Sequence, residues 1–239
     1  MSNQFDLNKV DASGDLRTMA ADAGALDAPI ERRAMLRKAA LAGGGVIVAG
    51  GLFEAMLTPA EAAISKKRKS KANDVKILNY ALTLEYLEAA FYAQGNANKA
   101  WKDAQYQKFA ELTGKHEAEH VVVLKKVLGK ASVKEPEFAF GAAVTDPATF
   151  AAVAQVLEDT GVAAYAGQVA NVQQRPVLEA AAAIHSVEAR HAAWIRFLTG
   201  GGAVGATDAN APAPESFDAP KTEGQVLHAV RKTGFVPGL

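Results

Sequence analysis

The sequence predicts an all-α fold, a four-helix bundle made of two helical hairpins joined by a long crossover. One observation is that the same two-helix unit occurs twice in the 239-residue chain. A second is that alanine, the strongest helix former, dominates both copies. A third is the length of the segment between the copies, residues 130–146, which is long enough to run from one end of a bundle to the other.

The repeat is clearest in two Glu-x-x-His pairs. Glu117 and His120 form the first pair, and Glu188 and His191 form the second, 71 residues later. Residues three apart lie on the same face of a helix. A carboxylate beside an imidazole is half of a metal site, although a single such pair also occurs by chance in many solvated helices. The repetition favours the metal interpretation.

A second repeated pair precedes each Glu-x-x-His pair. Glu85 and Tyr92 recur as Glu158 and Tyr165, 73 residues further along the chain. Each unit is therefore a helix that carries a glutamate and, two turns later, a tyrosine, followed by a helix that carries Glu-x-x-His. Two such hairpins side by side make a four-helix bundle.

Composition narrows the classes of function. The chain has 26 basic and 26 acidic side chains, so its charge gives no reason to expect nucleic acid as a partner. It has no cysteine, which excludes disulfides and thiolate metal sites. Carboxylates and imidazoles remain as the strong metal ligands.

The N-terminal part of the chain is typical of an exported protein. Residues 1–30 are polar and predicted to be disordered. Residues 31–63 have a basic start, an apolar middle and a small-x-small end, as export signals do. Arg32 and Arg33 resemble a twin-arginine signal, although Glu31 and Met35 depart from its usual pattern. We therefore expect a periplasmic or otherwise exported protein, anchored to the membrane if the signal is not cleaved.

Residues 64–72 form a basic arm, which we expect to be solvated; contact with an anionic membrane surface is the alternative. Helix signals then follow in order. Asn73 and Asp74 predict an N-cap, and Gly129 and Gly200 predict the ends of the second and fourth helices. Asp146-Pro147 and Arg175-Pro176 predict the starts of the third and fourth helices.

The 17-residue crossover can extend about 56 Å at about 3.3 Å per residue, whereas a helix of about 26 residues is about 39 Å long. It can therefore cross the whole bundle. The C-terminal tail, residues 201–239, is rich in Gly, Ala and Pro and shows one short helical stretch at 224–232.

The predicted helices would turn six metal-ligand side chains inward at one height, and buried carboxylates need compensating cations. Four carboxylates and two imidazoles suit two iron or two manganese ions, with Glu117 and Glu188 bridging and one histidine on each ion. Glu88 is a further candidate, either as an extra ligand or as a solvated residue. The six predicted ligands are Glu85, Glu117, His120, Glu158, Glu188 and His191.

Other polar residues lie near these positions. His116 and His185 are off the ligand positions, and His185, one turn before Glu188, is a candidate hydrogen-bond partner of the ligands. Asp159 and Arg190 each follow a ligand closely in sequence and are candidates for pairing across helices.

These motifs together resemble the ferritin-like superfamily of dinuclear-metal bundles. Over residues 73–200 the chain is most similar to exported bacterial ferritin-like proteins related to desiccation-related proteins. The resemblance implies a ferritin-like topology and carries the ligand role to the six residues above. It also implies that Tyr92 and Tyr165 bond to the ligands or quench radicals; ordinary core packing is the alternative for both.

Two functions from different classes follow. The first is an exported metalloprotein that reacts with O2 or peroxide, oxidising ferrous iron or removing peroxide in oxidative or desiccation stress; its electron donor would be external and is unknown. The alternative is a non-enzymatic stress or envelope scaffold, or a metal-binding protein, built on the same bundle. Iron storage in a cage of identical chains is a weaker third hypothesis, and the sequence leaves open whether the chain forms a homo-oligomer.

Overall fold

A computed structural model describes residue 64 and residues 69–200 and 211–237 of the chain. The predicted disordered region and export signal, residues 1–63, therefore lie outside the described residues, as do residues 65–68 of the basic arm and the beginning of the C-terminal tail.

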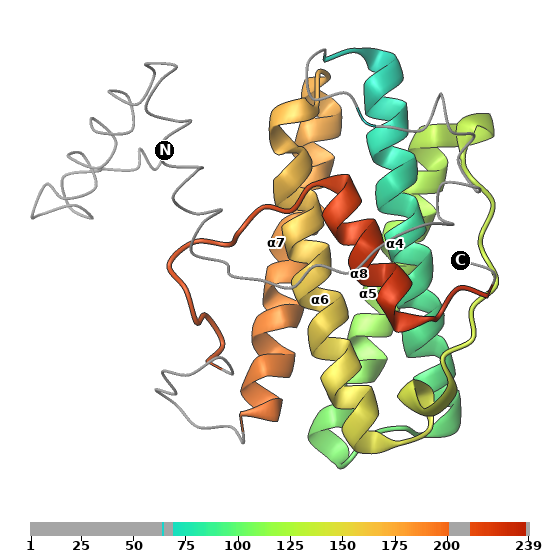
Figure 1. Ribbon diagram of the computed structural model, residues 1–239, viewed down its shortest axis with the longest axis vertical. Coiled ribbons are helices and arrows are strands. Elements are labelled where there is room, and N and C mark those ends of the chain that lie inside the picture. The colour runs from blue at the N-terminus through green and yellow to red at the C-terminus, as the bar shows by residue number, and fades with distance from the viewer. Residues whose placement is uncertain (1–63, 65–68, 201–210, 238–239) are drawn as a thin grey trace, which may run out of the picture. The chain divides into compact units, whose positions relative to one another are not determined.

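The described residues form five α-helices and no strand, which confirms the predicted all-α class (Figure 1). Four of the helices are long and one, near the C-terminus, is short. Three 3-10 turns, η2 (Gly129–Ala131), η3 (Gly141–Val144) and η4 (Val169–Asn171), lie in the connections. The α-helices are α4 (Lys71–Asn98), α5 (Ala104–Leu128), α6 (Pro147–Gln168), α7 (Arg175–Thr199) and α8 (Glu223–Thr233).

Most of the predicted helix ends are where the sequence places them. Asp146 caps α6 by accepting from the Thr149 amide, with Pro147 in the first turn. Gly129 and Gly200 end α5 and α7. The predicted start of the first helix is wrong, because Ser70 rather than Asn73 or Asp74 caps α4 and Lys71 is already helical. The last residues assigned to the basic arm are thus the first turn of this helix.

The residues expected to cap α4 have another role. Both are buried, and the Asp74 carboxylate accepts hydrogen bonds from the amides of Gln173 and Gln174, at 2.8 and 2.9 Å. The Asn73 side chain reaches the carbonyl of Asn171. The beginning of α4 therefore holds the connection between α6 and α7.

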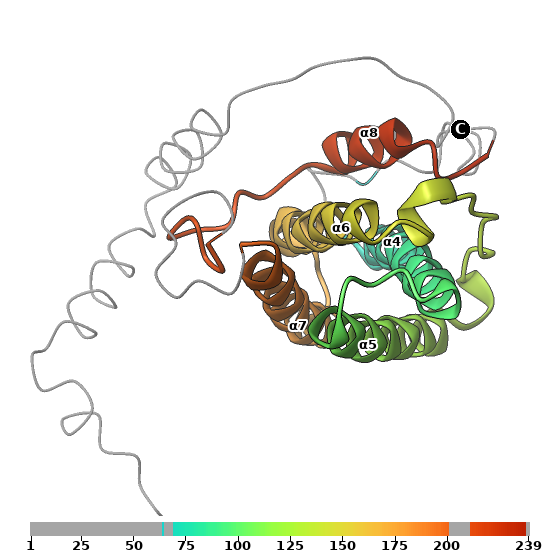
Figure 2. The same ribbon diagram turned by 90° about the horizontal axis from the view of Figure 1, so that it is seen from below.

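The four long helices form two antiparallel hairpins joined by a crossover along the bundle (Figures 1 and 2). Hydrogen bonds from the start of α4 to the α6–α7 connection mark one end. At the other end, Phe91 of α4 stacks on Phe150 at the start of α6, with ring centroids 4.9 Å apart. The crossover runs between the two ends, so α5 and α6 are parallel, and the predicted topology is confirmed.

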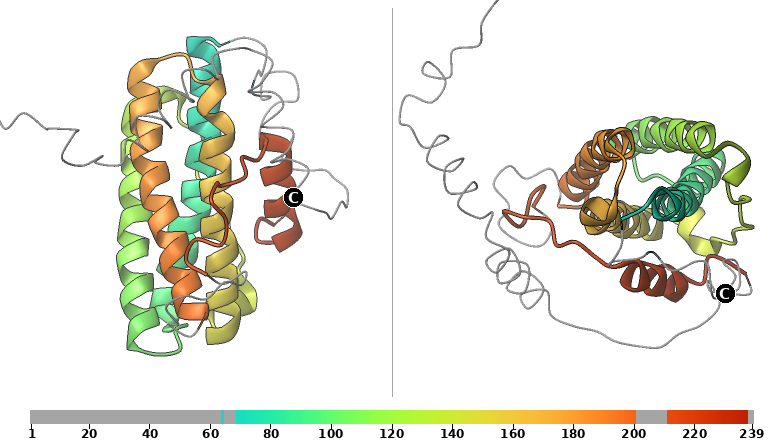
Figure 3. Two further views of the ribbon diagram at one scale, coloured as in Figure 1. Left: turned by 90° about the vertical axis from the view of Figure 1, so that its left-hand side faces the viewer. Right: turned by 90° about the horizontal axis from the view of Figure 1, so that it is seen from above.

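The short helix α8 lies outside the four-helix bundle, against α6 (Figures 2 and 3). It is close to the short helix predicted at 224–232, and its capping box joins Thr222 and Gln225. Val226 and Val230 are buried on its inner side. Just beyond it, the carbonyl of Phe235 accepts from the Ala139 amide at 2.8 Å, which ties the tail to the crossover.

No helix among the described residues is long and apolar enough to cross a membrane.

Candidate metal centre

The six predicted ligand residues meet inside the bundle. Glu85 comes from α4, Glu117 and His120 from α5, Glu158 from α6, and Glu188 and His191 from α7. All are buried except His120, whose side chain is 12% exposed. The helices bring these side chains to one height because each residue sits near the middle of its helix, as the repeated spacing requires.

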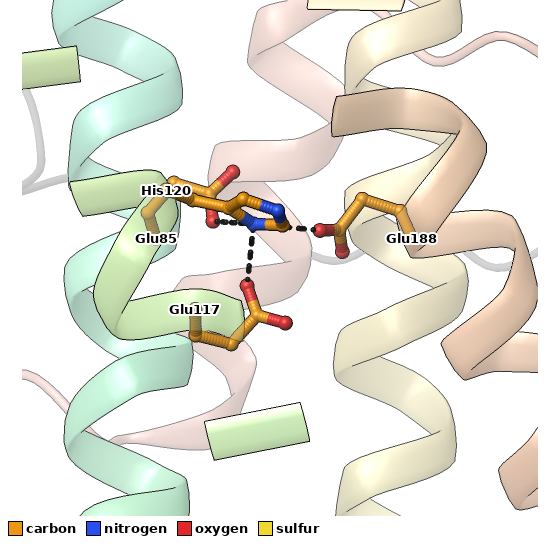
Figure 4. Close-up of side chains that lie close together, drawn as sticks. All are labelled: Glu85, Glu117, His120 and Glu188. Carbon is orange, nitrogen blue, oxygen red and sulfur yellow. Dashed lines mark hydrogen bonds and ion pairs between the residues drawn. The ribbon is translucent and has the colours of Figure 1, made fainter. Parts of the chain in front are cut away.

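The first group of side chains surrounds Nδ1 of His120 (Figure 4). This nitrogen lies 3.0 Å from Glu85 Oε2, 3.1 Å from Glu117 Oε2 and 3.2 Å from Glu188 Oε1. One ring nitrogen carries at most one proton and cannot donate well-aligned bonds to three carboxylates at once. Three oxygens that converge on one nitrogen are the arrangement expected of ligands around a common cation.

The second group surrounds Nδ1 of His191. Glu117 Oε1 lies 3.0 Å and Glu158 Oε2 lies 3.3 Å from this nitrogen, and Glu188 completes the group. Although these atoms are close, neither the nitrogen nor these two oxygens has a partner with hydrogen-bond geometry among the described residues. Glu117 and Glu188 belong to both groups, and within each group the candidate ligand atoms lie within 4.8 Å of one another.

The two tyrosines bond to the cluster across the bundle. The Tyr92 hydroxyl of α4 donates to Glu158 Oε1 of α6, and the Tyr165 hydroxyl of α6 donates to Glu85 Oε1 of α4. Each phenol thus holds the glutamate of the opposite hairpin. The arrangement has the two-fold pattern of the sequence repeat, and each bonded glutamate has one oxygen left to face the histidine.

Glu88 is also buried beside the cluster, and its Oε1 has no hydrogen-bond partner among the described residues. Gly161 makes room for it. A Cβ atom at Gly161 would lie 2.9 Å from Glu188 Oε2 and 3.5 Å from Glu88 Oε1. Glu88 therefore faces the carboxylates instead of solvent, although it belongs to neither of the two four-residue groups.

His116 takes a position that the sequence analysis did not assign to it. Its Nδ1 lies 2.8 Å from Nε2 of His191, and the two rings stack with centroids 5.1 Å apart. It thus fixes the ring whose other nitrogen faces the carboxylates. The four-residue spacing between His116 and His120, which places both on one side of α5, is the signal that could have found it.

The structure also bears on the expectations for Asp159, Arg190 and His185. Asp159 does pair across helices, with Arg196 of α7 at 2.6 Å. Arg190 instead bonds to Ser186 within its own helix, so the expectation is wrong for Arg190. Nε2 of His185 is buried without a hydrogen-bond partner among the described residues, which leaves its predicted role unsupported.

Burial and the closeness of charged neighbours determine the pKa values of the glutamates in the cluster. Burial raises the pKa of Glu85 to about 7 against the opposing hydrogen bond from His120. Burial, and then the charges of neighbouring glutamates, raise the pKa values of Glu88 and Glu188 well above the ordinary range. Burial also acts to raise the pKa of Glu117, but the contact with His120 and the adjacent His191 imidazole outweigh it and lower this pKa to about 2.

The histidines supply the opposite charge when only protons are available. Burial opposes the charged form, yet the adjacent carboxylates of Glu117, Glu188 and Glu85 raise the pKa of His120 to about 12. The adjacent carboxylates of Glu117 and Glu158 likewise raise the pKa of His191 to about 10. Protons on these imidazoles therefore neutralise carboxylates that metal ions could neutralise instead.

The donor set fits divalent or trivalent cations. It offers hard carboxylate oxygens and imidazole nitrogens, which suit iron or manganese. Several of the buried oxygens, including both of Glu188, have no hydrogen-bond partner among the described residues. Buried polar atoms without partners are rare unless a ligand or ion satisfies them.

Comparison with known proteins agrees with this geometry. The family model described as a ferritin-like domain matches residues 73–201, which include α4 to α7 and every residue of the cluster. A search among curated proteins found no match.

Proposed function

Because the chain belongs to the ferritin-like domain family over residues 73–201, we propose that its buried cluster holds two metal ions. The observation that supports this most directly is the pair of four-residue groups that share Glu117 and Glu188. In this proposal Glu85 and His120 would hold one ion and Glu158 and His191 the other, and the shared Glu117 and Glu188 would contribute to both.

Iron and manganese are the proposed metals. When bound, either would supply one-electron redox chemistry toward O2 or peroxide, in ferrous-iron oxidation or peroxide removal. The chain's own residues hold the donor atoms in place and keep bulk water away from them. Tyr92 and Tyr165 orient the terminal glutamates, and the stacked His116 orients His191.

Buried proton-binding groups next to the cluster support such chemistry. Burial, first of all, raises the pKa values of Tyr92, Tyr165 and Glu88, which favours the protonated form of each. The two tyrosine protons are already donated to Glu158 and Glu85, so a protonated Glu88 is the group that could donate to an oxygen species beside the cluster. A general acid must lie within hydrogen-bond reach of the atom it protonates, and Glu88 has an oxygen without a partner.

The test is metal analysis of the exported protein purified without added metal, followed by peroxide and ferrous-oxidation assays. We expect about two iron or manganese ions per chain, as in di-metal carboxylate bundles. Glu188→Gln should lose both ions because this side chain is in both groups. Glu179→Gln, an exposed change in the same helix, should keep them. Folded protein without stoichiometric metal would overturn the proposal and favour a scaffold without metal.

We also propose that the chain is exported and acts in oxidative or desiccation stress. Arg32, Arg33 and the apolar segment that follows them support export by the twin-arginine route. This route carries folded proteins, so metal could be bound in the cytoplasm before export. Cell fractionation should find the protein outside the cytoplasm, and the double variant Arg32→Lys, Arg33→Lys should retain it inside. The same distribution between cell fractions for the unchanged protein and the double variant would contradict the proposal.

A further inference from the structure

A cavity of about 120 Å³ opens at the end of the bundle where α4 and α7 begin and α5 and α6 end. All four long helices contribute to its wall. Its lining residues are Ile77, Leu78, Tyr80, Ala81, Leu84, Val123, Leu124, Val127, Ala164, Tyr165, Gln168, Val169, Val172, Pro176, Val177, Ala180 and Ala181.

The wall of this cavity is apolar. Apart from two tyrosines and Gln168, every lining residue is aliphatic, and none is charged. The Tyr165 hydroxyl donates to Glu85 and the Gln168 side-chain oxygen accepts from Asn171. The buried Tyr80 hydroxyl has no hydrogen-bond partner among the described residues. An apolar cavity of this kind holds water poorly and accepts apolar molecules.

The mouth of the cavity is apolar as well. Val123, Val127 and Val169 line it and are 46%, 54% and 50% exposed. Exposed aliphatic residues that continue into an apolar cavity indicate entry of an apolar group rather than of an ion. Lys126 and Lys130 are exposed beside Val123 and Val127 in sequence, at the end of α5, where they can meet a negatively charged group that stays in water.

The inner wall of the cavity reaches the carboxylate cluster. The Tyr165 ring lines the cavity while its hydroxyl donates to Glu85. Leu84, another lining residue, directly precedes Glu85 in α4. A molecule in the cavity would therefore lie one side chain away from the cluster.

We propose that this cavity binds one unbranched alkyl chain, that of a fatty acid, with its methyl end toward Tyr165 and its carboxylate at the valine mouth. A ligand that reaches the cavity through water needs a polar head, and the uncharged lining leaves that head outside. The aliphatic wall matches methylene groups, and the lysines at the end of α5 match the carboxylate. Binding does not require metal in the cluster.

Isothermal titration of the full protein with propanoate, butanoate, pentanoate and hexanoate tests the proposal, because a cavity of about 120 Å³ has room for only a few methylene groups. Each buried methylene contributes about 0.8 kcal/mol, which is about a fourfold gain in affinity. We expect one fatty acid bound per protein molecule and a steady gain in affinity along the series. The titration is made with metal-free and with metal-loaded protein, so failure to bind metal and failure to bind the fatty acid are separate results.

Matched variants test whether the fatty acid binds in the cavity. Ala181→Leu fills lining space at a partly buried position and should weaken hexanoate binding at least tenfold. Ala183→Leu adds the same group at an exposed position of the same helix and should bind as the unchanged protein does. Both keep a good helix former, and melting curves verify that they fold. Equal binding by the two variants, or no gain with chain length, would overturn the proposal.

A second copy of the protein is the competing occupant of the valine mouth. Val122, next to the mouth but not part of its lining, is 65% exposed. If sedimentation shows a dimer that Val122→Glu dissociates, and the dimer binds none of the fatty acids, the mouth is a contact between copies and the proposal is wrong. A monomer that binds hexanoate supports the proposal.

Discussion

In the metal-free cluster, His120 and His191 hold protons that a bound metal ion would displace. Their raised pKa values, about 12 and about 10, mean that both imidazoles are charged near neutral pH when no cation is present. A metal ion needs the neutral imidazole, so binding must release these protons. Metal affinity should therefore increase with pH, because protons compete for the same atoms.

The stability of the metal-free protein should have the opposite dependence on pH. Burial raises the pKa of Glu85 from 4.5 to about 7. The folded state therefore binds more protons than the unfolded state between these values, and the free energy of unfolding should fall by about 3 kcal/mol across this window. The raised pKa values of Glu88 and Glu188 act in the same direction.

Urea unfolding of chelator-treated protein between pH 5 and pH 8 measures this effect. Added metal should flatten the profile, since cations replace the protons that the cluster loses. Glu85→Gln should reduce the dependence in the metal-free protein. Stability that increases with pH over this range would mean that the cluster is not crowded with buried carboxylates.

Gly161 should tolerate no side chain. The Cβ of Gly161→Ala would approach Glu188 Oε2 at 2.9 Å, so a carboxylate shared by both metal groups must move. We expect at least a tenfold loss of metal affinity, in the range seen when supporting residues of metal sites are changed. Gly224→Ala in α8 is the control, because nothing lies within 4 Å of its Cβ. Competition with a chelator measures the affinity, and equal affinities in both variants would contradict this role.

At the scale of single elements, α4 is more than a carrier of ligands. Its first turn holds the connection that leads into α7, through the buried Asp74 carboxylate. Because α7 carries Glu188 and His191, the register of that helix depends on where the connection is fixed.

Asp74→Ala should lower the free energy of unfolding by about 3 kcal/mol. The change removes two hydrogen bonds to a charged acceptor and leaves the amides of Gln173 and Gln174 without it. Glu119→Ala, an exposed change on α5, should have little effect. Urea unfolding compares the two variants. Equal stabilities would mean that water replaces the carboxylate at no cost.

Helical spacing within the sequence predicts the long helices and the candidate ligands. Features that depend on tertiary contacts are missed. Glu117, His120, Glu188 and His191 are found because helical spacing determines which residues share a face. The cap of α4 is misplaced because Ser70, Asn73 and Asp74 are all good caps, and only tertiary contacts with residues 171–174 distinguish them.

Contacts between helices limit what spacing can predict. The bond from Tyr92 to Glu158 and that from Tyr165 to Glu85 depend on which helices are opposite each other. The choice of Arg196 over Arg190 as the partner of Asp159 depends on the relative heights of α6 and α7. The apolar cavity depends on how side chains from four helices fill the end of the bundle, so it cannot be predicted from any single stretch of sequence.

At the scale of the whole molecule, the C-terminal segment completes the fold around the bundle. Val226 and Val230 of α8 are buried, the Lys221 amide donates to the Ala163 carbonyl, and Phe235 bonds to the crossover through Ala139. The tail thus contacts both α6 and the crossover, although it lies far from both in sequence.

Val226→Asp should detach α8 without removing the metal centre. A buried charge at this fully buried position is costly, so the helix should leave α6. Hydrogen exchange should then become faster in residues 223–233 and at Ala139, while metal content stays unchanged. Lys232→Asp, on the exposed side of α8, is the control. Loss of metal in Val226→Asp would show that the tail supports the centre directly.

Among the buried carboxylates of the centre, Glu88 has no counterpart in the second half of the repeat. Gly161 follows Glu158 as Glu88 follows Glu85, and a side chain at Gly161 would meet Glu188 and Glu88 where the glycine now makes room. One half of the centre therefore has a carboxylate that the other half lacks. The two ions would be chemically unlike, and a stepwise titration should fill them one after the other.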